Sequence, residues 1–375
     1  MIMSRAERLA ILCFYEKDGF VDTYVYHLVE ELISVSDKVI IAVNGKIEEK
    51  AKVYFEKRHC TVWVRENEGY DAGAYQDVFR RLGRNEINRY TQIVLCNDTF
   101  FGPFIPMKSM FEQMEAKKSD FWGISYQDTN LVRFIGSYFL VFGERVIQSG
   151  DLWNYFENMR EVAAYQDALI YFEFGIFLYL TGKGYVHSSV ISKKKYFSNL
   201  ICPYENLKYE KLPVLKKRAF TGKDKANMRR AVKFVQDNFN YDVNLIHSWM
   251  QRNNIVPEAD DVPDETGAAV KTNEIPQLSI NDIYQFMDRW KEVYIYGNGY
   301  YGHILIELYR IKPQYIIVSD GQASRQSQYR GIPVIAVSEI DFKKKEAGII
   351  VALNKSNTHA VEEVLGRGEN ILYMW

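Results

Sequence analysis

The first 130 residues alternate short apolar runs with segments in which apolar residues recur every three or four positions. We expect strands at the runs and helices between them, because side chains repeat every two residues in a strand and every 3.6 in a helix. The expected strands are 9–15, 38–44, 61–67, 92–97 and 120–126, and the expected helices are 22–33, 47–57, 73–82 and 106–117. This alternation predicts a mostly parallel sheet with helices on both faces, which binds ligands at the carboxyl ends of its strands.

The pattern of apolar and polar residues changes after residue 134 and again toward the C-terminal part of the sequence. The expected elements are a strand at 137–142, helices at 144–160 and 165–181, a strand at 185–190 and a short helix at 280–290. Residues 251–278 are acidic, contain proline and have few large apolar side chains, which is typical of a linker. We therefore expect an α/β fold with one domain at 1–250, a linker at 251–278 and a small domain at 279–375.

Charge and apolar run lengths limit the kinds of partner. The 375 residues include 47 Lys and Arg against 48 Asp and Glu, so no nucleic-acid partner is expected. The longest apolar stretch, 168–181, contains Glu173 and is shorter than the roughly 20 residues that span a bilayer. Four scattered cysteines, without a CxxC pair, are expected to be buried free thiols. These features predict a cytoplasmic protein, and leave open its contact with the inner face of the cell membrane.

Two strand ends carry polar residues suited to a phosphorylated ligand. The third strand runs into RENEGYDAGA (65–74), where Gly69 and Gly73 let the backbone and helix amides approach an anion, although an ordinary tight turn explains the same residues. The fourth strand ends in Asn97, Asp98 and Thr99, whose oxygens suit Mg²⁺ or Mn²⁺. A turn or helix cap explains a single aspartate there equally well.

An acidic residue and a basic segment are further candidates. Glu173 interrupts an aromatic, apolar helix, where a charge is costly unless it is paired or used, and burial would raise its pKa toward that of a general base. A paired structural glutamate, or one on the solvent-facing side of the helix, is the alternative, and Asp167 is a rival base that a helix N-terminus explains more simply. Basic residues crowd between 208 and 233, including Lys216, Lys217 and Arg218. They either bind phosphate groups or a membrane surface, or form a solvated helix face.

Six segments, in this order, resemble the rhamnan-synthesis protein F family: FYEKDGFVDTYVYHL (14–28), NEGYDAGAY (67–75), NDTFFGP (97–103), FWGIS (121–125), SYFLVF (137–142) and YFEFGIFLYLTGKGY (171–185). The resemblance covers about residues 9–220 and implies a GT-A-like glycosyltransferase domain. It further implies inverting transfer of a deoxyhexose, typically rhamnose from dTDP-rhamnose, to a lipid-linked cell-wall or lipopolysaccharide glycan at the inner membrane face.

The resemblance also assigns residues. Glu173 would be the base, and Asp98 would meet a metal ion or the donor diphosphate. The NDT triplet offers one carboxylate where the family of folds carries a DxD pair, so basic residues are an alternative to the metal. The donor would be bound by Phe14, Tyr15, Asp18, Asn67, Gly69, Asp71, Gly73, Asn97 and Thr99.

The C-terminal part carries a GxGxxG spacing between an expected strand and helix. Gly297, Gly299 and Gly302, with Asp320 after the next strand, fit the fingerprint of a Rossmann-like module that binds NAD or a sugar nucleotide. Two other functions therefore stay open. One is an NAD-linked sugar-modifying oxidoreductase, against which the lack of a Tyr-x-x-x-Lys pair after this loop counts, and the other is a non-catalytic sugar-nucleotide-binding scaffold.

Overall fold

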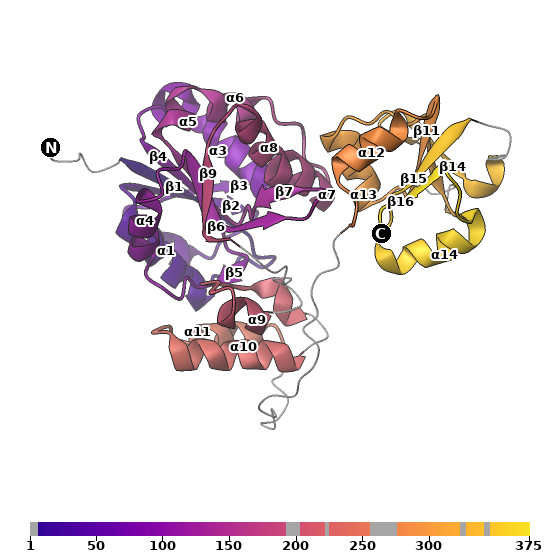
Figure 1. Ribbon diagram of the computed structural model, residues 1–375. Coiled ribbons are helices and arrows are strands. Elements are labelled where there is room, and N and C mark those ends of the chain that lie inside the picture. Colours follow the sequence, from indigo (N-terminus) through magenta and orange to yellow (C-terminus); the bar gives the residue numbers. More distant parts are fainter. Residues whose placement is uncertain (1–6, 193–202, 222–224, 256–275, 323–327, 341–345) are drawn as a thin grey trace. The chain divides into compact units, whose positions relative to one another are not determined.

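The computed structural model describes residues 7–192, 203–221, 225–255, 276–322, 328–340 and 346–375 (Figure 1). Its contacts divide the chain into two units. The first comprises Met1–Gln127 and Phe134–Asn273, and the second comprises Asp128–Arg133 and Glu274–Trp375. Most of the expected linker, 251–278, lies outside the described residues, so the domain boundaries stay predictions.

The first unit is built on one large sheet. Its strand order is β3-β2-β1-β4-β8-β6-β7, with β9 beside β6. The strands are β1 (Arg8–Phe14), β2 (Lys38–Asn44), β3 (Thr61–Arg65), β4 (Gln92–Asn97), β6 (Phe121–Asp128), β7 (Arg133–Ile135), β8 (Phe139–Gly143) and β9 (His187–Ser192). Strands β3, β2, β1 and β4 are parallel, whereas β8 runs antiparallel to β4 and β6. The predicted mostly parallel sheet is confirmed.

Helices cover this sheet on both faces. Figure 1 shows α1 (Thr23–Val35) and α4 (Met107–Glu115) on one side of it and α3 (Tyr70–Ile87) and α6 (Asp151–Glu157) on the other. The other helices of this unit are α2 (Glu49–Lys57), α5 (Glu144–Gln148), α7 (Tyr165–Ala168), α8 (Gly175–Gly182), α9 (Pro203–Lys208), α10 (Lys225–Asn238) and α11 (Asn244–Arg252). Every residue of β1 is buried, as expected for a strand covered on both faces.

The single helix expected at 144–160 is wrong, because two short helices, α5 and α6, stand there. Gly150 separates them with a φ of 80°, a left-handed conformation that favours glycine. A Cβ at this position would lie 2.4 Å from Nη2 of Arg84, which is the flexible end of that side chain, so the left-handed φ is the stronger reason for glycine here.

The helix expected at 165–181 is present but contains a wider turn. A π-helix, Leu169–Phe174, joins α7 to α8. The Tyr155 hydroxyl donates a hydrogen bond to the Tyr171 carbonyl, and a Cβ at Gly175 would lie 2.5 Å from that hydroxyl oxygen. A side chain inserted into the backbone ladder in this way displaces the regular α-helical bonds and accounts for the widened turn.

A two-strand ribbon brings the basic segment back to the sheet. Strand β10 (Leu215–Lys216) pairs antiparallel with β5 (Phe100–Phe101), and the amide of Lys217 donates to the carbonyl of Thr99 over 2.9 Å. Phe100 and Phe101 are buried in the core, which anchors the ribbon. Lys216 is the last residue of β10, and Lys217 and Arg218 begin a 3₁₀-helix, Lys217–Thr221, so the alternative of a solvated helix face does not describe Lys216.

The second unit contains a sheet of order β13-β14-β12-β11-β15-β16. Its elements are α12 (Ile280–Met287), β11 (Glu292–Tyr296), α13 (Tyr300–His303), a π-helix (Ile304–Leu308), β12 (Tyr315–Val318), β13 (Gln328–Tyr329), β14 (Ile332–Ala336), a 3₁₀-helix (Val337–Glu339), β15 (Ala347–Val351), α14 (Lys355–Leu365) and β16 (Ile371–Tyr373). Five neighbouring strands of this sheet are parallel, as predicted for a Rossmann-like module; in sheet order they are β14, β12, β11, β15 and β16. Across the described parts of both units, no helix is long and apolar enough to cross a membrane.

Candidate functional site

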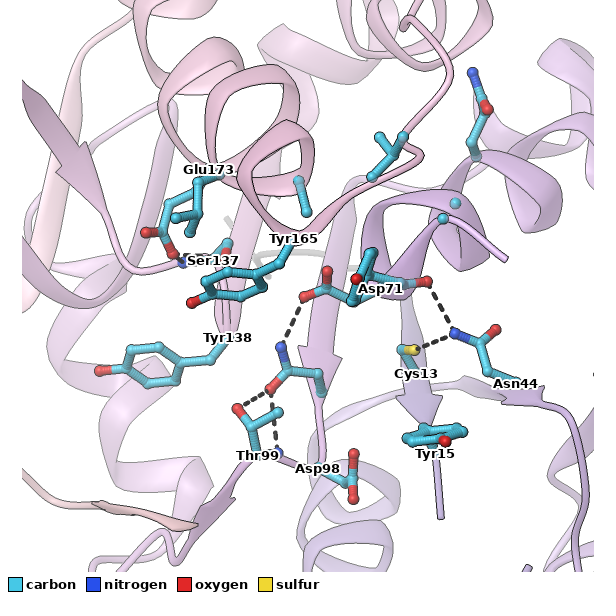
Figure 2. Close-up of a pocket in the computed structure, with 18 of the residues that line it drawn as sticks. Cys13, Tyr15, Asn44, Asp71, Asp98, Thr99, Ser137, Tyr138, Tyr165 and Glu173 are labelled. Atoms are coloured by element: carbon cyan, nitrogen blue, oxygen red, sulfur yellow. Dashed lines mark hydrogen bonds between the residues drawn. The ribbon is translucent and has the colours of Figure 1, made fainter. Parts of the chain in front are cut away.

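A cavity of about 1310 Å³ opens at the carboxyl ends of the parallel strands of the first unit. Side chains from the ends of β1 to β4, the start of α3, the π-helix and the β10 ribbon line it. Figure 2 shows Asp71, Thr99, Tyr165 and Glu173 around this one pocket. The predicted site residues that line it are Tyr15, Asn67, Gly69, Asp71, Gly73, Asn97, Asp98, Thr99 and Glu173.

The two motifs that the sequence placed at strand ends touch each other. Asn97 Nδ2 donates to Asp71 Oδ2 over 2.8 Å, and Asn97 Oδ1 accepts from the Thr99 hydroxyl over 2.6 Å. Burial raises the pKa of Asp71, against the lowering effect of the Asn97 hydrogen bond. The loop after β3 and the loop after β4 therefore form one surface.

Two residues that hold this surface were missed from the sequence, Asn44 and Arg65. Arg65 Nη1 donates to Asn44 Oδ1 over 2.5 Å and to the Glu68 carbonyl over 2.9 Å, and Asn44 Nδ2 donates to the Tyr70 carbonyl over 2.9 Å. They fasten the turn before α3 to the sheet. Their positions in the sequence could have indicated a role at the site, because each is the last residue of a parallel strand, where ligands bind.

Gly69 is required by the backbone of this turn. Its φ is 73°, and a Cβ would lie 2.9 Å from the Cα of Gly73. We expect Gly69→Ala to lower the free energy of unfolding by about 1–3 kcal/mol, through left-handed strain and this clash. Gly182→Ala, at the end of α8 with nothing within 4 Å of the added Cβ, is the matched control and should not destabilise the protein. Urea denaturation of both variants measures the difference, and equal unfolding midpoints would contradict the strain.

Glu173 faces the cavity from the π-helix. Its Oε2 accepts the backbone N–H of Ser137 over 2.9 Å and the Ser137 hydroxyl over 2.7 Å (Figure 2). Burial raises the pKa of Glu173, which the two Ser137 hydrogen bonds only partly offset. Its described hydrogen bonds come from Ser137 and none from a lysine or arginine side chain, so the role of base and the alternative of a paired structural glutamate both stay open.

Exposed aromatic rings stand at the cavity beside Glu173. Tyr70 and Tyr165 both line the cavity, lie edge to face with ring centroids 6.2 Å apart, and are each about half exposed. The guanidinium of Arg218 lies 5.5 Å from the centroid of the Tyr165 ring. Flat, exposed rings of this kind can stack against the apolar face of a sugar.

The carboxylate of Asp98 is already engaged. Its Oδ2 accepts from Lys217 Nζ over 2.9 Å and from the Tyr24 hydroxyl over 3.1 Å, and its side chain is only 7% exposed. Next to it, the Thr99 hydroxyl accepts from Lys216 Nζ over 2.7 Å. Two ammonium groups therefore contact the oxygens that would ligate a divalent cation.

This donor set does not fit Mg²⁺ or Mn²⁺. Mg²⁺ at a phosphate site is held by at least one carboxylate, and waters and phosphate oxygens complete its shell, so that carboxylate must be free to meet the ion. Here Asp98 and Thr99 accept hydrogen bonds from lysines, and Asn97 Oδ1 accepts one from Thr99. Within the described ranges, no group of three or more His, Cys, Asp or Glu side chains is placed to hold a metal ion.

Other predicted residues lie away from the cavity. Phe14 belongs to the buried core cluster of α1, because alternate residues of β1 face opposite sides of the sheet and Cys13 takes the cavity side. Asp18 is exposed, caps the amide of Phe20 and lies 3.8 Å from Arg252. Asp167 accepts the backbone amides of Ala163 and Ala164, which is the helix-terminal role that the sequence offered as its simpler explanation.

The glycines of the second unit shape its first turn. Gly297 has a φ of 121°, and a Cβ at Gly302 would lie 2.2 Å from the Gly297 carbonyl oxygen, whereas one at Gly299 would meet nothing within 4 Å. Asp320 accepts the amide and hydroxyl of Ser338. The α-helix that follows the turn, α13, has only four residues before a π-helix begins. Nucleotide binding by the three glycines and Asp320 stays a prediction.

Three cysteines are buried free thiols, as predicted: Cys13, Cys60 and Cys96. Burial raises the pKa of all three, for Cys60 to about 11, so none is activated as a thiolate. Cys202 lies outside the described residues.

Comparison with known proteins gives a family and distant likenesses. The uncharacterized protein y4gN of Sinorhizobium fredii (strain NBRC 101917 / NGR234) is 26% identical over 162 residues, which are 42% of this chain and 41% of that protein. The chain thus spans less than half the length of this curated relative.

Among solved structures, a cytidylyltransferase from Leptospira borgpetersenii serovar Hardjo-bovis (strain JB197) matches with a TM-score of 0.32 and 14% identity, over 68% of this chain and 98% of that one. Glucosyl-3-phosphoglycerate synthase from Mycobacterium tuberculosis, in complex with Mn²⁺, UDP and glucosyl-3-phosphoglycerate, matches with a TM-score of 0.25 and 9% identity, over 37% and 58%. Likeness this slight carries no argument about function.

The family model for rhamnan synthesis protein F matches residues 39–283, from the start of β2 into α12. This is well over half of the chain. The chain therefore belongs to the rhamnan synthesis protein F family.

Proposed function

We propose that the chain is a glycosyltransferase that moves a sugar from a nucleotide-activated donor to a growing glycan. The family supports a role in making a rhamnose polymer, and dTDP-rhamnose is the donor that we propose. The observation that carries the proposal is a single cavity that joins Glu173 to the Asn67–Gly73 turn and to two lysines. A nucleotide sugar has a group to match each of these: an anionic diphosphate for the lysines and the turn, and a reactive anomeric carbon for the acid.

The cavity offers a place for each part of the donor. The nucleoside would lie over Tyr15 and Asn67, at the ends of β1 and β3, and the diphosphate would lie toward Lys216. The anomeric carbon then faces Glu173. Tyr70 and Tyr165, exposed beside it, would receive the acceptor sugar, and we propose that this acceptor is a lipid-linked glycan at the inner face of the membrane.

The reaction that follows is a displacement with inversion. An acceptor hydroxyl oxygen attacks the anomeric carbon from the face opposite the diphosphate, and a new carbon–oxygen bond forms. The bond to the diphosphate breaks, and its electron pair leaves with the nucleoside diphosphate. The Glu173 carboxylate takes the hydroxyl proton, and burial raises its pKa, which makes it a stronger base than an exposed carboxylate.

A thermal-shift panel of sugar nucleotides and NADH tests this proposal on the full chain. We expect dTDP-rhamnose to raise the melting temperature more than the other ligands, because specific binding stabilises the folded state by mass action. Release of dTDP from dTDP-rhamnose, followed over time, then separates an enzyme from a scaffold. Stabilisation by NADH alone would favour the oxidoreductase, and donor binding without turnover on any glycan acceptor would favour the scaffold.

A further inference from the structure

We infer that Lys216 and Lys217 take the place of a divalent metal at the donor site, so that their ammonium groups neutralise the diphosphate of a nucleoside-diphosphate sugar. The inference rests on the proposed function, because it concerns how the same donor is held. It starts from a disagreement in the structure: the triplet Asn97 to Thr99 stands where the fold would carry metal ligands, yet its oxygens contact lysines.

Each lysine is held at the cavity by several contacts. Lys216 Nζ donates to the Thr99 hydroxyl over 2.7 Å and lies 4.1 Å from the centroid of the Tyr138 ring. Lys217 Nζ donates to Asp98 Oδ2 over 2.9 Å and to the Tyr24 hydroxyl over 2.6 Å. An ammonium group has three donor hydrogens, so each lysine keeps capacity for a phosphate oxygen.

The charge at this point matches that of a metal site. Two ammonium groups with the single carboxylate of Asp98 leave one net positive charge, as would one divalent cation with the same carboxylate. The chain therefore needs no second acid in the triplet, since a second carboxylate would cancel the remaining charge. Asp98 has a positioning role here, because it fixes Lys217 without facing the donor as a metal ligand.

The position of the lysines follows from the ribbon that carries them. The pairing of β10 with β5 sets Lys216 opposite Phe100, and the backbone of Lys217 is bonded to that of Thr99. Backbone hydrogen bonds thus fix the two lysines relative to the triplet, in addition to the hydrogen bonds that their side chains make. Such preorganised charge stabilises a leaving diphosphate without the cost of ordering it during the reaction.

Lys216 lies among charged and polar groups at the cavity. Burial lowers the pKa of Lys216 to about 8, although acidic neighbours work against this. The groups that face it are Glu173, Asp71, Cys96, Lys217, the Tyr138 ring and the Thr99 hydroxyl.

Isothermal titration of the full chain with dTDP tests the inference. We expect the same dissociation constant, within about twofold, with EDTA and with Mn²⁺ or Mg²⁺ present. Lys216→Met, which keeps the apolar stem and removes the charge, should weaken dTDP binding by about 10- to 100-fold, the range for a lost charge-assisted hydrogen bond. Lys216→Arg should restore part of the affinity, because arginine keeps the positive charge.

Lys233→Met is the matched control, since Lys233 is an exposed residue of α10 that pairs only with Asp237 among its described ion pairs and does not line the cavity. It should bind dTDP like the unchanged protein. If EDTA weakens binding tenfold and Mn²⁺ restores it, the inference is wrong while the proposed function stands. If no nucleoside diphosphate binds with or without metal, both are wrong. Circular dichroism of Lys216→Met shows whether a lost affinity is a lost fold, and Lys216→Arg then decides.

Discussion

Glu173→Gln is expected to lower the rate of sugar transfer by about 100- to 10,000-fold, the usual contribution of a general base. Glutamine has the same shape, and its oxygen can still accept both hydrogen bonds from Ser137. It cannot take a proton from the acceptor hydroxyl. The fold and the affinity for dTDP should therefore be unchanged, and the loss should appear in kcat.

Two neighbouring variants sharpen this experiment. Ser137→Ala removes one of the hydrogen bonds that lower the pKa of Glu173, so its pKa should rise further. The acid limb of the pH–rate profile should then move to higher pH, because the base must be deprotonated to act. Asp167→Asn should keep full activity, since Asp167 caps a helix and does not line the cavity. If Glu173→Gln retained half of the original kcat, another group would be the base.

Asp98→Ala should lower the free energy of unfolding of the first unit by about 3 kcal/mol. The change removes the carboxylate that pairs with Lys217 in a largely buried place, so that the ammonium group keeps only the Tyr24 hydroxyl among its described hydrogen-bond partners, and removing one partner of a buried ion pair is costly. Removing both charges is much less costly. The double variant Asp98→Ala, Lys217→Met should therefore regain part of the lost stability.

Urea denaturation of the two single variants and the double variant, as a mutant cycle, measures the coupling between the two side chains. The double variant should bind dTDP more weakly than the unchanged protein, because a phosphate-binding charge is gone. Stability and donor affinity would thus separate. Additive losses in the cycle would show that Asp98 and Lys217 do not act as a pair.

The sequence predicted the strands of the first unit better than its site. The bounds of 38–44 and 92–97 agree with β2 and β4, because parallel strands buried on both faces are continuous apolar runs. Two loops were predicted to meet because both follow parallel strands, and Asn97 bonds to Asp71. Phe14 was misplaced because an apolar run shows no alternation, so the sequence does not reveal which residues of β1 face the cavity.

The contacts of the basic segment could not be predicted in the same way. Lys217 and Asp98 are 119 positions apart, and the element that joins them is a two-residue strand, too short to give a periodic pattern. The hydrogen bonds that hold Glu173 depend on a π-helix whose cause, the Tyr155 hydroxyl, lies in a different helix. Local propensity carries no information about such insertions.

The π-helix between α7 and α8 shifts the phase of one continuous helical segment. A regular helix advances about 100° per residue, so one extra residue in a turn rotates everything beyond it by that amount relative to what came before. Ile176, Phe177 and Leu180 of α8 can then be buried in the interior while Glu173, on the widened turn itself, lines the cavity. One helical segment thus packs against the core and also places an acid at the cavity. A helix of uniform pitch would have to do both with the same face.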